Sequence, residues 1–336
     1  MSAKTHKNLR VGLALGSGAA RGWAHIGVIR ALNEAGVQVD VVAGSSIGAV
    51  VGAAHAAGRT TRLEEWVRAL DWQQMAGYFD FAFRGGLIKA RRVFDGLEEA
   101  FGDQTIESLP TPYAAVATDL STGHEVWLRE GSVYDALRAS VALPGLLTPA
   151  KLGDRWLVDG GLVNPVPVSV CRALGADVVI AVDLNTTLIG RRVRDDSAAV
   201  AVADNELMPE ASPASAPSAG RGRRDRNSPV ANAFQNRLHD VASDVRKRLG
   251  LDEAGDREPP SPSIYNVIAN SVNIMQVRIT RSRMAGDPAD ILIAPQLADF
   301  GLLDFDRADE AIAEGERAAR AALEVGSTLI QPRSVS

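Results

Sequence analysis

Short apolar runs alternate with amphipathic stretches along the first half of the chain. Residues 9–15 and 39–43 are apolar runs of strand length, and a glycine-containing turn follows each of them. After each turn comes a stretch with helical spacing of its apolar positions, over residues 23–35 and 46–57. Buried strands that alternate with helices are typical of a parallel sheet covered by helices, so the pattern predicts an α/β protein.

The same patterns predict the remaining elements. Further helices are expected over 62–70, 93–101, 135–140, 236–249, 263–284 and 307–323. Further strands are expected over 113–118, 124–128, 155–158, 176–184 and 290–294. The first two of these strands are joined across the turn signal Ser121-Thr122-Gly123, which predicts that they pair.

A polar region interrupts this pattern between about residues 187 and 232. It contains RRVRDD and PEASPASAPSAGRGRRDRNSP and has few large apolar side chains. Such a composition cannot bury enough apolar surface to offset the entropy lost on ordering, so we expect a disordered insertion over 187–232. We expect residues 9–186 to form the core, and residues 233–328 to complete the same domain with helices and a strand.

The composition narrows the classes of function. The net charge of the 336 residues is -5, which gives no overall basic field, so we expect no nucleic-acid partner. No apolar stretch reaches the ~18 residues of a spanning helix, and the run Val11–Leu15 is too short for a signal peptide. The single cysteine, Cys171, excludes an intramolecular disulfide and fits a reducing compartment. We expect a cytoplasmic protein that would meet a lipid peripherally, at a membrane surface.

The segment Gly44-Ser45-Ser46-Ile47-Gly48 is a G-x-S-x-G motif between a predicted strand and a predicted helix. A turn of this kind strains the backbone of the central serine and projects its hydroxyl from the sheet edge. Gly44 and Gly48 allow neighbouring segments to approach closely, and the N-terminus of the helix favours a developing negative charge. Ser46 is therefore a candidate nucleophile, and the alternative is a glycine-serine turn with a structural role alone.

A glycine-rich loop, residues 16–22, joins the first predicted strand to its helix. Successive backbone N–H groups in such a loop can bind an anion. The dinucleotide pattern is not met because Arg21 replaces its third glycine, and no Gly-Lys-Ser/Thr follows, so we expect no cofactor and no metal. Beside a serine nucleophile the loop fits an oxyanion hole, whereas Arg21 alone would also fit a surface position. The candidate residues of the hole are Gly16, Ser17, Gly18, Ala19, Arg21 and Gly22.

A serine nucleophile needs a base, and no histidine is well placed to be one. The five histidines are His6, His25, His55, His124 and His239. His55, for example, follows Ser46 by more than two helical turns, about 13 Å. Asp159, before Gly160 and Gly161, ends a short predicted strand and could open onto a site. Asp159 also fits a β-turn, and Asp119 and Asp183 end other predicted strands, so the base stays open at this point.

Three motifs in a fixed order resemble the patatin-like phospholipase family over about residues 9–186. They are Gly16-x-Gly18-x-x-Arg21-Gly22, Gly44-x-Ser46-x-Gly48 and Asp159-Gly160-Gly161, and WAHIGVIRAL at 23–32 and ASVALP at 139–144 are similar to bacterial members. The resemblance implies a three-layer α/β/α fold with a central, mostly parallel sheet. It also implies a lipid or acyl-ester substrate, hydrolysed through an acyl-enzyme by a Ser-Asp dyad. Ser46 would be the nucleophile and Asp159 the base, with oxyanion donors around Gly18 and Ala19.

Two further expectations concern the substrate. A fatty acyl chain needs an apolar groove, and its candidate walls are Phe79, Phe81, Phe83, Leu87, Ile88, Leu143, Leu146 and Leu147. The three phenylalanines alternate along the chain and would share one side of an extended segment. The alternative to an enzyme is a non-catalytic lipid-binding or regulatory protein with a patatin-like fold.

Overall fold

The computed structural model describes residues 9–69, 80–82, 87–89, 91–186 and 264–326 of the 336-residue chain. The chain divides into two units, Met1–Arg192 together with Ile268–Ser336, and Val193–Val267. The fold and the candidate site belong to the first unit. The insertion expected over 187–232 and the helix expected over 236–249 lie outside the described residues.

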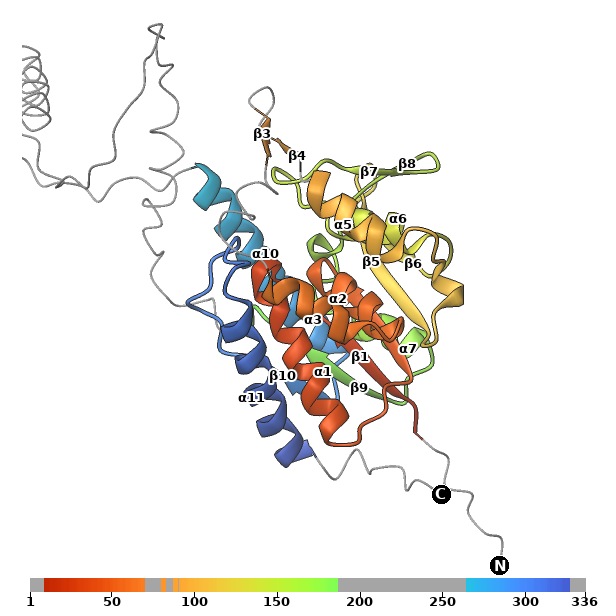
Figure 1. The fold of residues 1–336 in the computed structure, drawn as a ribbon, viewed down its shortest axis with the longest axis vertical. Helices are drawn as coiled ribbons and strands as arrows, with labels where there is room; N and C mark the ends of the chain where they lie inside the picture. The colour runs from red at the N-terminus through yellow and green to blue at the C-terminus, as the bar shows by residue number, and fades with distance from the viewer. Residues whose placement is uncertain (1–8, 70–79, 83–86, 90, 187–263, 327–336) are drawn as a thin grey trace, which may run out of the picture. The chain divides into compact units, whose positions relative to one another are not determined.

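An eight-stranded sheet lies at the centre of the first unit (Figure 1). Its parallel part has the order β10 (Ile291–Ile293), β9 (Val178–Val182), β1 (Val11–Leu15), β2 (Val41–Ser45) and β5 (Tyr113–Asp119). Antiparallel strands extend it beyond β5, namely β6 (Glu125–Leu128), β8 (Arg155–Asp159) and β7 (Ala150–Leu152). The predicted α/β fold with a central, mostly parallel sheet is confirmed.

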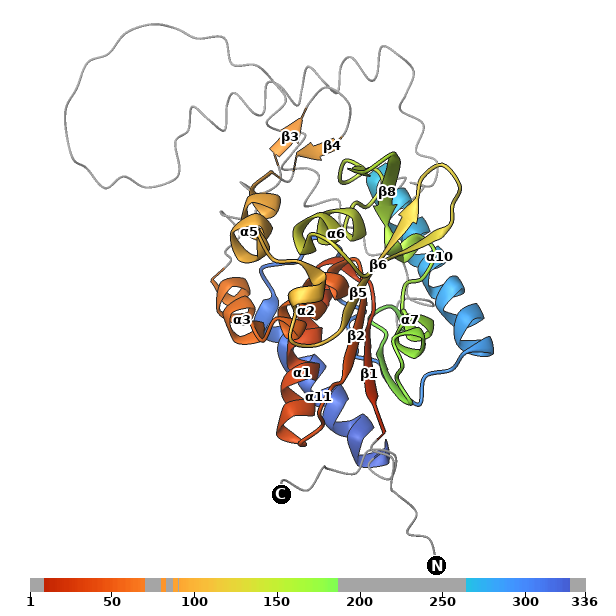
Figure 2. The ribbon, with the colours of Figure 1, turned by 90° about the vertical axis from the view of Figure 1, so that its right-hand side faces the viewer.

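Helices cover both faces of this sheet and make the three layers. Figure 2 shows α1 (Ala24–Glu34), α2 (Ile47–Ala56), α3 (Thr60–Arg68) and α11 (Ala308–Gly326) on one side, and α7 (Val168–Ala173) and α10 (Ile264–Gly286) on the other. Side chains of the strands alternate between two apolar clusters, with Leu13, Leu15 and Val42 in one and Ala14, Val41 and Ala43 in the other. The continuous apolar runs of the sequence therefore reflect strands buried on both faces.

Most predicted elements occur within a few residues of their expected bounds. The strand pair predicted across Ser121-Thr122-Gly123 is the antiparallel pair β5–β6. The remaining helices of the first half are α5 (Arg91–Phe101) and α6 (Val133–Ser140). Three short strands were not expected, which are β7 and the antiparallel pair β3 (Asp80–Ala82) and β4 (Leu87–Lys89). No helix in the described part of the chain is long and apolar enough to cross a membrane.

The C-terminal helix α11 packs along α1, near the start of the chain. A side chain on Gly27 of α1 would collide with the carbonyl group of Ile312, and one on Gly315 of α11 would collide with that of Ala24. The two backbones therefore approach at glycines, where no Cβ separates them. This contact joins the C-terminal part of the chain to the helix that follows the glycine loop.

Candidate active site

The strand order brings Ser46 and Asp159 together. β2 pairs with residues 113–116 of β5, and β8 pairs with residues 117–119. Since β6 occupies the other edge of β5, β2 and β8 lie end to end along the same edge. Ser46 directly follows β2 and Asp159 ends β8, so the two residues meet where the strands end. The Oγ of Ser46 donates a hydrogen bond to Oδ2 of Asp159 at 2.5 Å.

Ser46 has the strained backbone that the G-x-S-x-G motif predicts. Its φ is 57° and its ψ is -127°, a conformation that costs a non-glycine residue about 1–3 kcal/mol. A side chain on Gly48 would collide with the carbonyl group of Leu15, so the turn fits against β1 only with glycine there. The backbone N–H of Ser46 donates to Oγ of Ser140 at 2.9 Å. The turn is therefore fixed on two sides by packing and by a hydrogen bond.

Asp159 is a buried carboxyl group with only 1% of its surface exposed. Besides the Ser46 hydroxyl, it accepts the backbone N–H of Gly161 on Oδ1 at 2.7 Å. Burial raises the pKa of Asp159 to about 6, because the charged form loses its hydration, while the two hydrogen bonds favour that form and oppose the rise. Thr118 of β5 donates its hydroxyl to the carbonyl oxygen of Asp159 at 2.8 Å.

The glycine loop, residues 16–22, follows β1 and includes most of the 3₁₀ helix η1 (Ala19–Trp23). The N–H groups of Gly16 and Ser17 donate to carbonyl groups of β9 and of the segment before α7, and that of Arg21 donates to Gly18. Among the described residues, the N–H groups of Gly18 and Ala19 have no hydrogen-bond partner. Ala19 also lines the cavity that contains Ser46. Of the predicted oxyanion residues, these two therefore have donors to offer a ligand.

Arg21 is buried, with 1% of its surface exposed, so the surface position considered from the sequence is wrong. Its Nε donates to the carbonyl of Gly18 at 3.1 Å, and its Nη2 donates to Oδ1 of Asn273 on α10 at 3.0 Å. Burial lowers the pKa of Arg21 to about 10, and the nearby carboxylates of Asp183 and Asp304 oppose that fall. Arg21 is still charged at neutral pH and holds the loop from within.

Two further polar side chains, those of His25 and Asn185, hold the glycine loop by hydrogen bonds. His25 places Nε2 2.8 Å from the carbonyl of Gly16, and burial lowers the pKa of His25 to about 4, so the ring is neutral and Nε2 is the donor. Asn185 donates Nδ2 to the carbonyl of Ser17 at 3.1 Å and to Gln276 of α10 at 3.0 Å. No motif in the sequence indicates these contacts, and those of Asn185 join segments far apart in the chain.

The rival bases have other partners. Asp119 accepts the hydroxyl and the N–H of Ser121, and Asp183 accepts the N–H of Asn185. Among the described residues, no histidine is hydrogen-bonded to Ser46 or Asp159. No group of three or more His, Cys, Asp or Glu side chains in this part of the chain is placed to hold a metal.

A cavity of about 230 Å³ contains Ser46 in its wall. α2 contributes Ile47, Val50 and Ala54 from one face, and other apolar side chains come from α3, α5, the segment after α6 and the loop before α11. The predicted walls Leu143, Leu146 and Leu147 line it, together with Trp23, Leu63, Trp66, Leu97, Phe101 and Phe305. Of the other predicted walls, Phe79 and Phe83 lie outside the described residues, and Phe81, Leu87 and Ile88 are described in their backbone alone.

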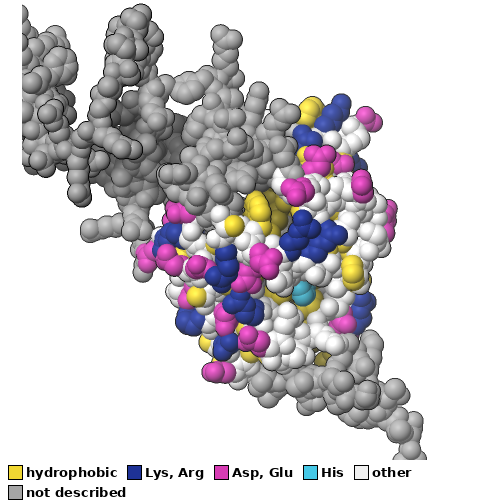
Figure 3. Space-filling view, viewed as in Figure 1, with side chains coloured by type: hydrophobic (Ala, Val, Ile, Leu, Met, Phe, Trp, Pro, Cys, Tyr) yellow, Lys and Arg dark blue, Asp and Glu magenta, His cyan; other side chains and the backbone are white. Residues whose placement is uncertain are grey.

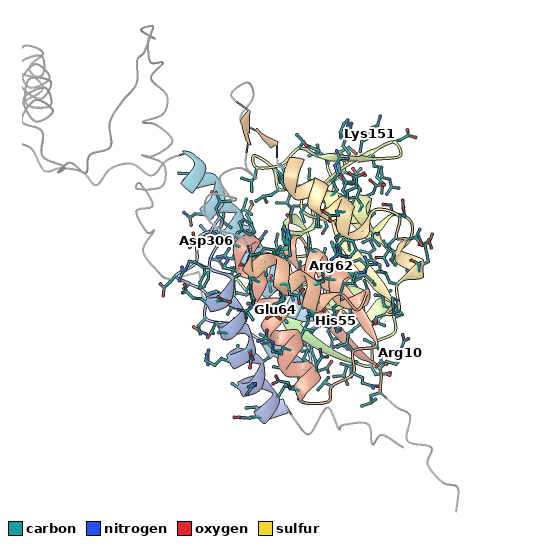
Figure 4. All side chains as sticks on the ribbon, viewed as in Figure 1. Arg10, His55, Arg62, Glu64, Lys151 and Asp306 are labelled. Carbon is teal, nitrogen blue, oxygen red and sulfur yellow. The ribbon has the colours of Figure 1, made fainter. Side chains whose placement is uncertain are left out.

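The charged residues of the cavity wall are Arg59, Arg62 and Glu99. Arg62, labelled in Figure 4, lies in the first turn of α3 on the face turned to the viewer. In Figure 3 this face presents hydrophobic side chains beside a group of basic ones. The cavity is thus apolar with a few charged side chains, as a site for a molecule with a hydrocarbon part would be.

Comparisons with known proteins identify the family of the chain. Residues 13–172, which include all three motifs, match the family model "Patatin-like phospholipase". An uncharacterized NTE family protein of Mycobacterium tuberculosis is 37% identical over 329 residues, covering 94% of this chain and 91% of the relative. Patatin-like phospholipase domain-containing protein 6 of Mus musculus is 35% identical over 184 residues, 52% of this chain and 14% of that protein. The chain belongs to the patatin-like phospholipase family, which supports lipid acyl hydrolysis.

A solved structure also resembles the chain. VipD from Legionella pneumophila has a TM-score of 0.44 and 12% sequence identity, over 95% of this chain and 67% of that one.

Proposed function

We propose that this protein is a serine-type lipid acyl hydrolase in which Ser46 is the nucleophile and Asp159 the base. One observation carries the proposal: the Ser46 hydroxyl donates a 2.5 Å hydrogen bond to a buried carboxylate and lies in the wall of an apolar cavity. Direct proton transfer needs this hydrogen-bond distance between nucleophile and base. Membership of the patatin-like family supports the same chemistry.

The first half of the reaction forms an acyl-enzyme. Asp159 accepts the proton of the Ser46 hydroxyl as its oxygen attacks the ester carbonyl. The N–H groups of Gly18 and Ala19 would stabilise the oxyanion of the tetrahedral intermediate, where each donor is worth about 3–4 kcal/mol. The intermediate collapses as the ester C–O bond breaks, and the leaving alcohol takes the proton from Asp159.

The second half releases the acid. Asp159, again a carboxylate, takes a proton from a water molecule that attacks the acyl-enzyme carbonyl. The second tetrahedral intermediate collapses with loss of the Ser46 oxygen, which recovers its proton from Asp159. One water is consumed and one fatty acid is released, so the enzyme returns to its starting state. A base works best when its pKa is near the working pH, and burial moves the pKa of Asp159 in that direction.

The cavity favours an ester with an apolar acyl chain. Ala54 lies eight residues beyond Ser46 on the cavity-lining face of α2, about 12 Å along the helix axis. In an extended chain the C–C bonds of about 1.5 Å run in a zigzag, so each carbon adds about 1.25 Å and roughly ten carbons span this length. We therefore propose fatty acyl esters, with the acyl chain along α2, as the substrate class.

The test compares wild type, Ser46→Ala, Asp159→Asn and the control Ser45→Ala. Ser45 is a buried serine whose hydroxyl has no hydrogen-bond partner among the described residues. Hydrolysis of a panel of phospholipids, lysophospholipids and p-nitrophenyl esters should fall at least about a thousandfold in the first two variants and stay near wild type in the control. Undiminished hydrolysis by Ser46→Ala or Asp159→Asn would overturn the dyad.

Labelling separates an enzyme from a lipid-binding protein that lacks activity. A fluorophosphonate probe reacts covalently with an activated serine. The wild type and Ser45→Ala should be labelled, and Ser46→Ala should not. A wild type that binds lipid but neither reacts with the probe nor hydrolyses any ester of the panel would support the alternative of a non-catalytic lipid-binding protein.

A further inference from the structure

The end of helix α6 contacts the backbone of both proposed catalytic residues. Ser140, the last residue of α6, accepts the backbone N–H of Ser46 on its Oγ at 2.9 Å. Two residues later, the carbonyl of Ala142 accepts the backbone N–H of Asp159 at 3.0 Å. Residues 140–142 therefore bind both partners of a pair that is 113 positions apart in the sequence.

Ser140 also ties the Ser46 turn to the central strand β5. Its side chain is fully buried, and its hydroxyl donates to the carbonyl of Val116 at 2.6 Å. Val116 pairs with Ser45 at the end of β2, and the next residue of β5 pairs with Asp159 at the end of β8. The hydroxyl of Ser140 thus joins the nucleophile turn to the point on β5 where the two strands meet.

The hydroxyl of Ser140 is fully engaged by these two hydrogen bonds. A serine hydroxyl has one proton to donate, and Ser140 gives it to Val116 while it accepts from Ser46. The strained conformation of Ser46 persists only if surrounding contacts hold it, and an amide N–H without a partner would favour relaxation of the turn. The Ser140 contact fixes the Ser45–Ser46 peptide, and with it the direction of the Ser46 hydroxyl toward Asp159.

We propose that Ser140 is a positioning residue that sets the geometry of the Ser46–Asp159 pair through the backbone of Ser46. The proposal rests on the proposed function, since it concerns how that pair is held. Misplacement by about 1 Å can slow an enzyme about a hundredfold without any loss of a reacting group. Because Ser140 acts on the nucleophile turn, its loss should lower kcat and leave KM nearly unchanged.

The experiment compares Ser140→Ala with Ser45→Ala. The hydroxyl of Ser45 is buried one residue from the nucleophile and makes no hydrogen bond to any described residue, so its removal is the matched control. Steady-state hydrolysis of a soluble p-nitrophenyl ester and the rate of fluorophosphonate labelling are measured for both. We expect kcat and the labelling rate of Ser140→Ala to fall about tenfold to a hundredfold, with KM within about twofold of wild type. Ser45→Ala should match the wild type in both measurements.

Two further variants separate position from folding. Ser140→Thr keeps the hydroxyl and should restore labelling to within about threefold of wild type. Ser140→Cys keeps the size but offers only a weak hydrogen-bonding group, so it should behave like Ser140→Ala. Thermal unfolding checks that each variant is folded, and Ser140→Cys replaces Ser140→Ala if the latter is not. Wild-type kcat in a folded Ser140→Ala or Ser140→Cys would overturn the positioning role. That result, with Ser46→Ala inactive, leaves the proposed function intact, whereas an active Ser46→Ala would overturn the proposed function itself.

Discussion

Asp159 is buried, and burial opposes the charge that a base must carry. Its pKa is raised to about 6, so the carboxyl group is protonated in acid and ionised at neutral pH. Only the ionised form can take the proton of Ser46. Hydrolysis by this pair should therefore be lost as the pH falls through the pKa of Asp159 and be constant above it.

We predict that kcat/KM for a soluble p-nitrophenyl ester rises about tenfold per pH unit below about pH 6 and levels off above it. His25 is also buried near the site, but its pKa is lowered to about 4, so its ring is mostly neutral through this range. Measuring kcat/KM between pH 4.5 and 8 with the wild type and Ser45→Ala checks the profile. A flat profile across this range would contradict a base with the environment of Asp159.

At this scale the sequence predicted the residues that stand in motifs. The strand-turn-helix around Ser46 predicts a nucleophile there, and the order of the three motifs predicts Asp159 as its base. Ser140 stands in the segment ASVALP, but the similarity of that segment to bacterial members assigns the serine no contact, and Asn185 stands in no motif. Their contacts depend on which strands lie side by side, and one chain's apolar pattern does not fix that order.

Helix α2 links the nucleophile to the apolar cavity. It begins directly after Ser46 and lines the cavity with Ile47, Val50 and Ala54, which are spaced so that they share one face. Ala54 is the smallest of the three and lies farthest from Ser46. A larger side chain there would fill the distant part of the cavity and leave the part beside Ser46 open.

We predict that Ala54→Leu shortens the preferred acyl chain. Each buried methylene contributes about 0.8 kcal/mol, so losing the places of two or three of them should lower kcat/KM for a palmitoyl ester at least about tenfold. The butyryl ester ends before Ala54 and should be hydrolysed at nearly the wild-type rate, which makes it the internal control. Equal loss on both esters would mean that the chain does not run along α2.

At the scale of helices and strands, the apolar pattern predicts some elements and misses others. Elements with a clear apolar pattern, such as the amphipathic α1 and the apolar run of β1, lie within one or two residues of their predicted bounds. β7 was not expected, since it has three residues and pairs at an edge. α10 was expected as a helix. Its residues Asn273 and Gln276 are polar, and they bond to Arg21 of the glycine loop and to Asn185, which holds that loop. A hydrophobic pattern cannot indicate such partners.

In the first unit, the C-terminal helix α11 packs against α1, near the start of the chain. α11 packs on α1 at Gly27 and Gly315, and ion pairs join Arg30 to Glu316 and Glu34 to Arg320 across the two helices. The first pair is partly buried and the second exposed, and such surface pairs contribute little, so the close backbone contact is the main constraint. The sequence predicted a helix and a strand in this region but not their places, because packing of chain segments so far apart has no local signal.

Gly315 provides a test of the packing between α11 and α1. A side chain there would meet the carbonyl of Ala24, the first residue of α1, directly after the 3₁₀ helix that carries Ala19 and Arg21. We predict that Gly315→Leu pushes α1 and α11 apart at a cost of about 1–3 kcal/mol and lowers Tm by several degrees, although leucine favours a helix more than glycine does.

The activity of the same variant shows how far that contact reaches. Since α1 begins where the glycine loop ends, displacement of Ala24 should move the N–H groups of Gly18 and Ala19 and lower kcat of the folded Gly315→Leu protein as well as its Tm. Ala313→Leu is the matched control, because Ala313 is exposed and lies two residues away on the same helix. Thermal unfolding and p-nitrophenyl ester hydrolysis are measured side by side. A lower Tm with unchanged kcat would mean that α11 stabilises the fold without setting the oxyanion loop, and an unchanged Tm would contradict the close packing itself.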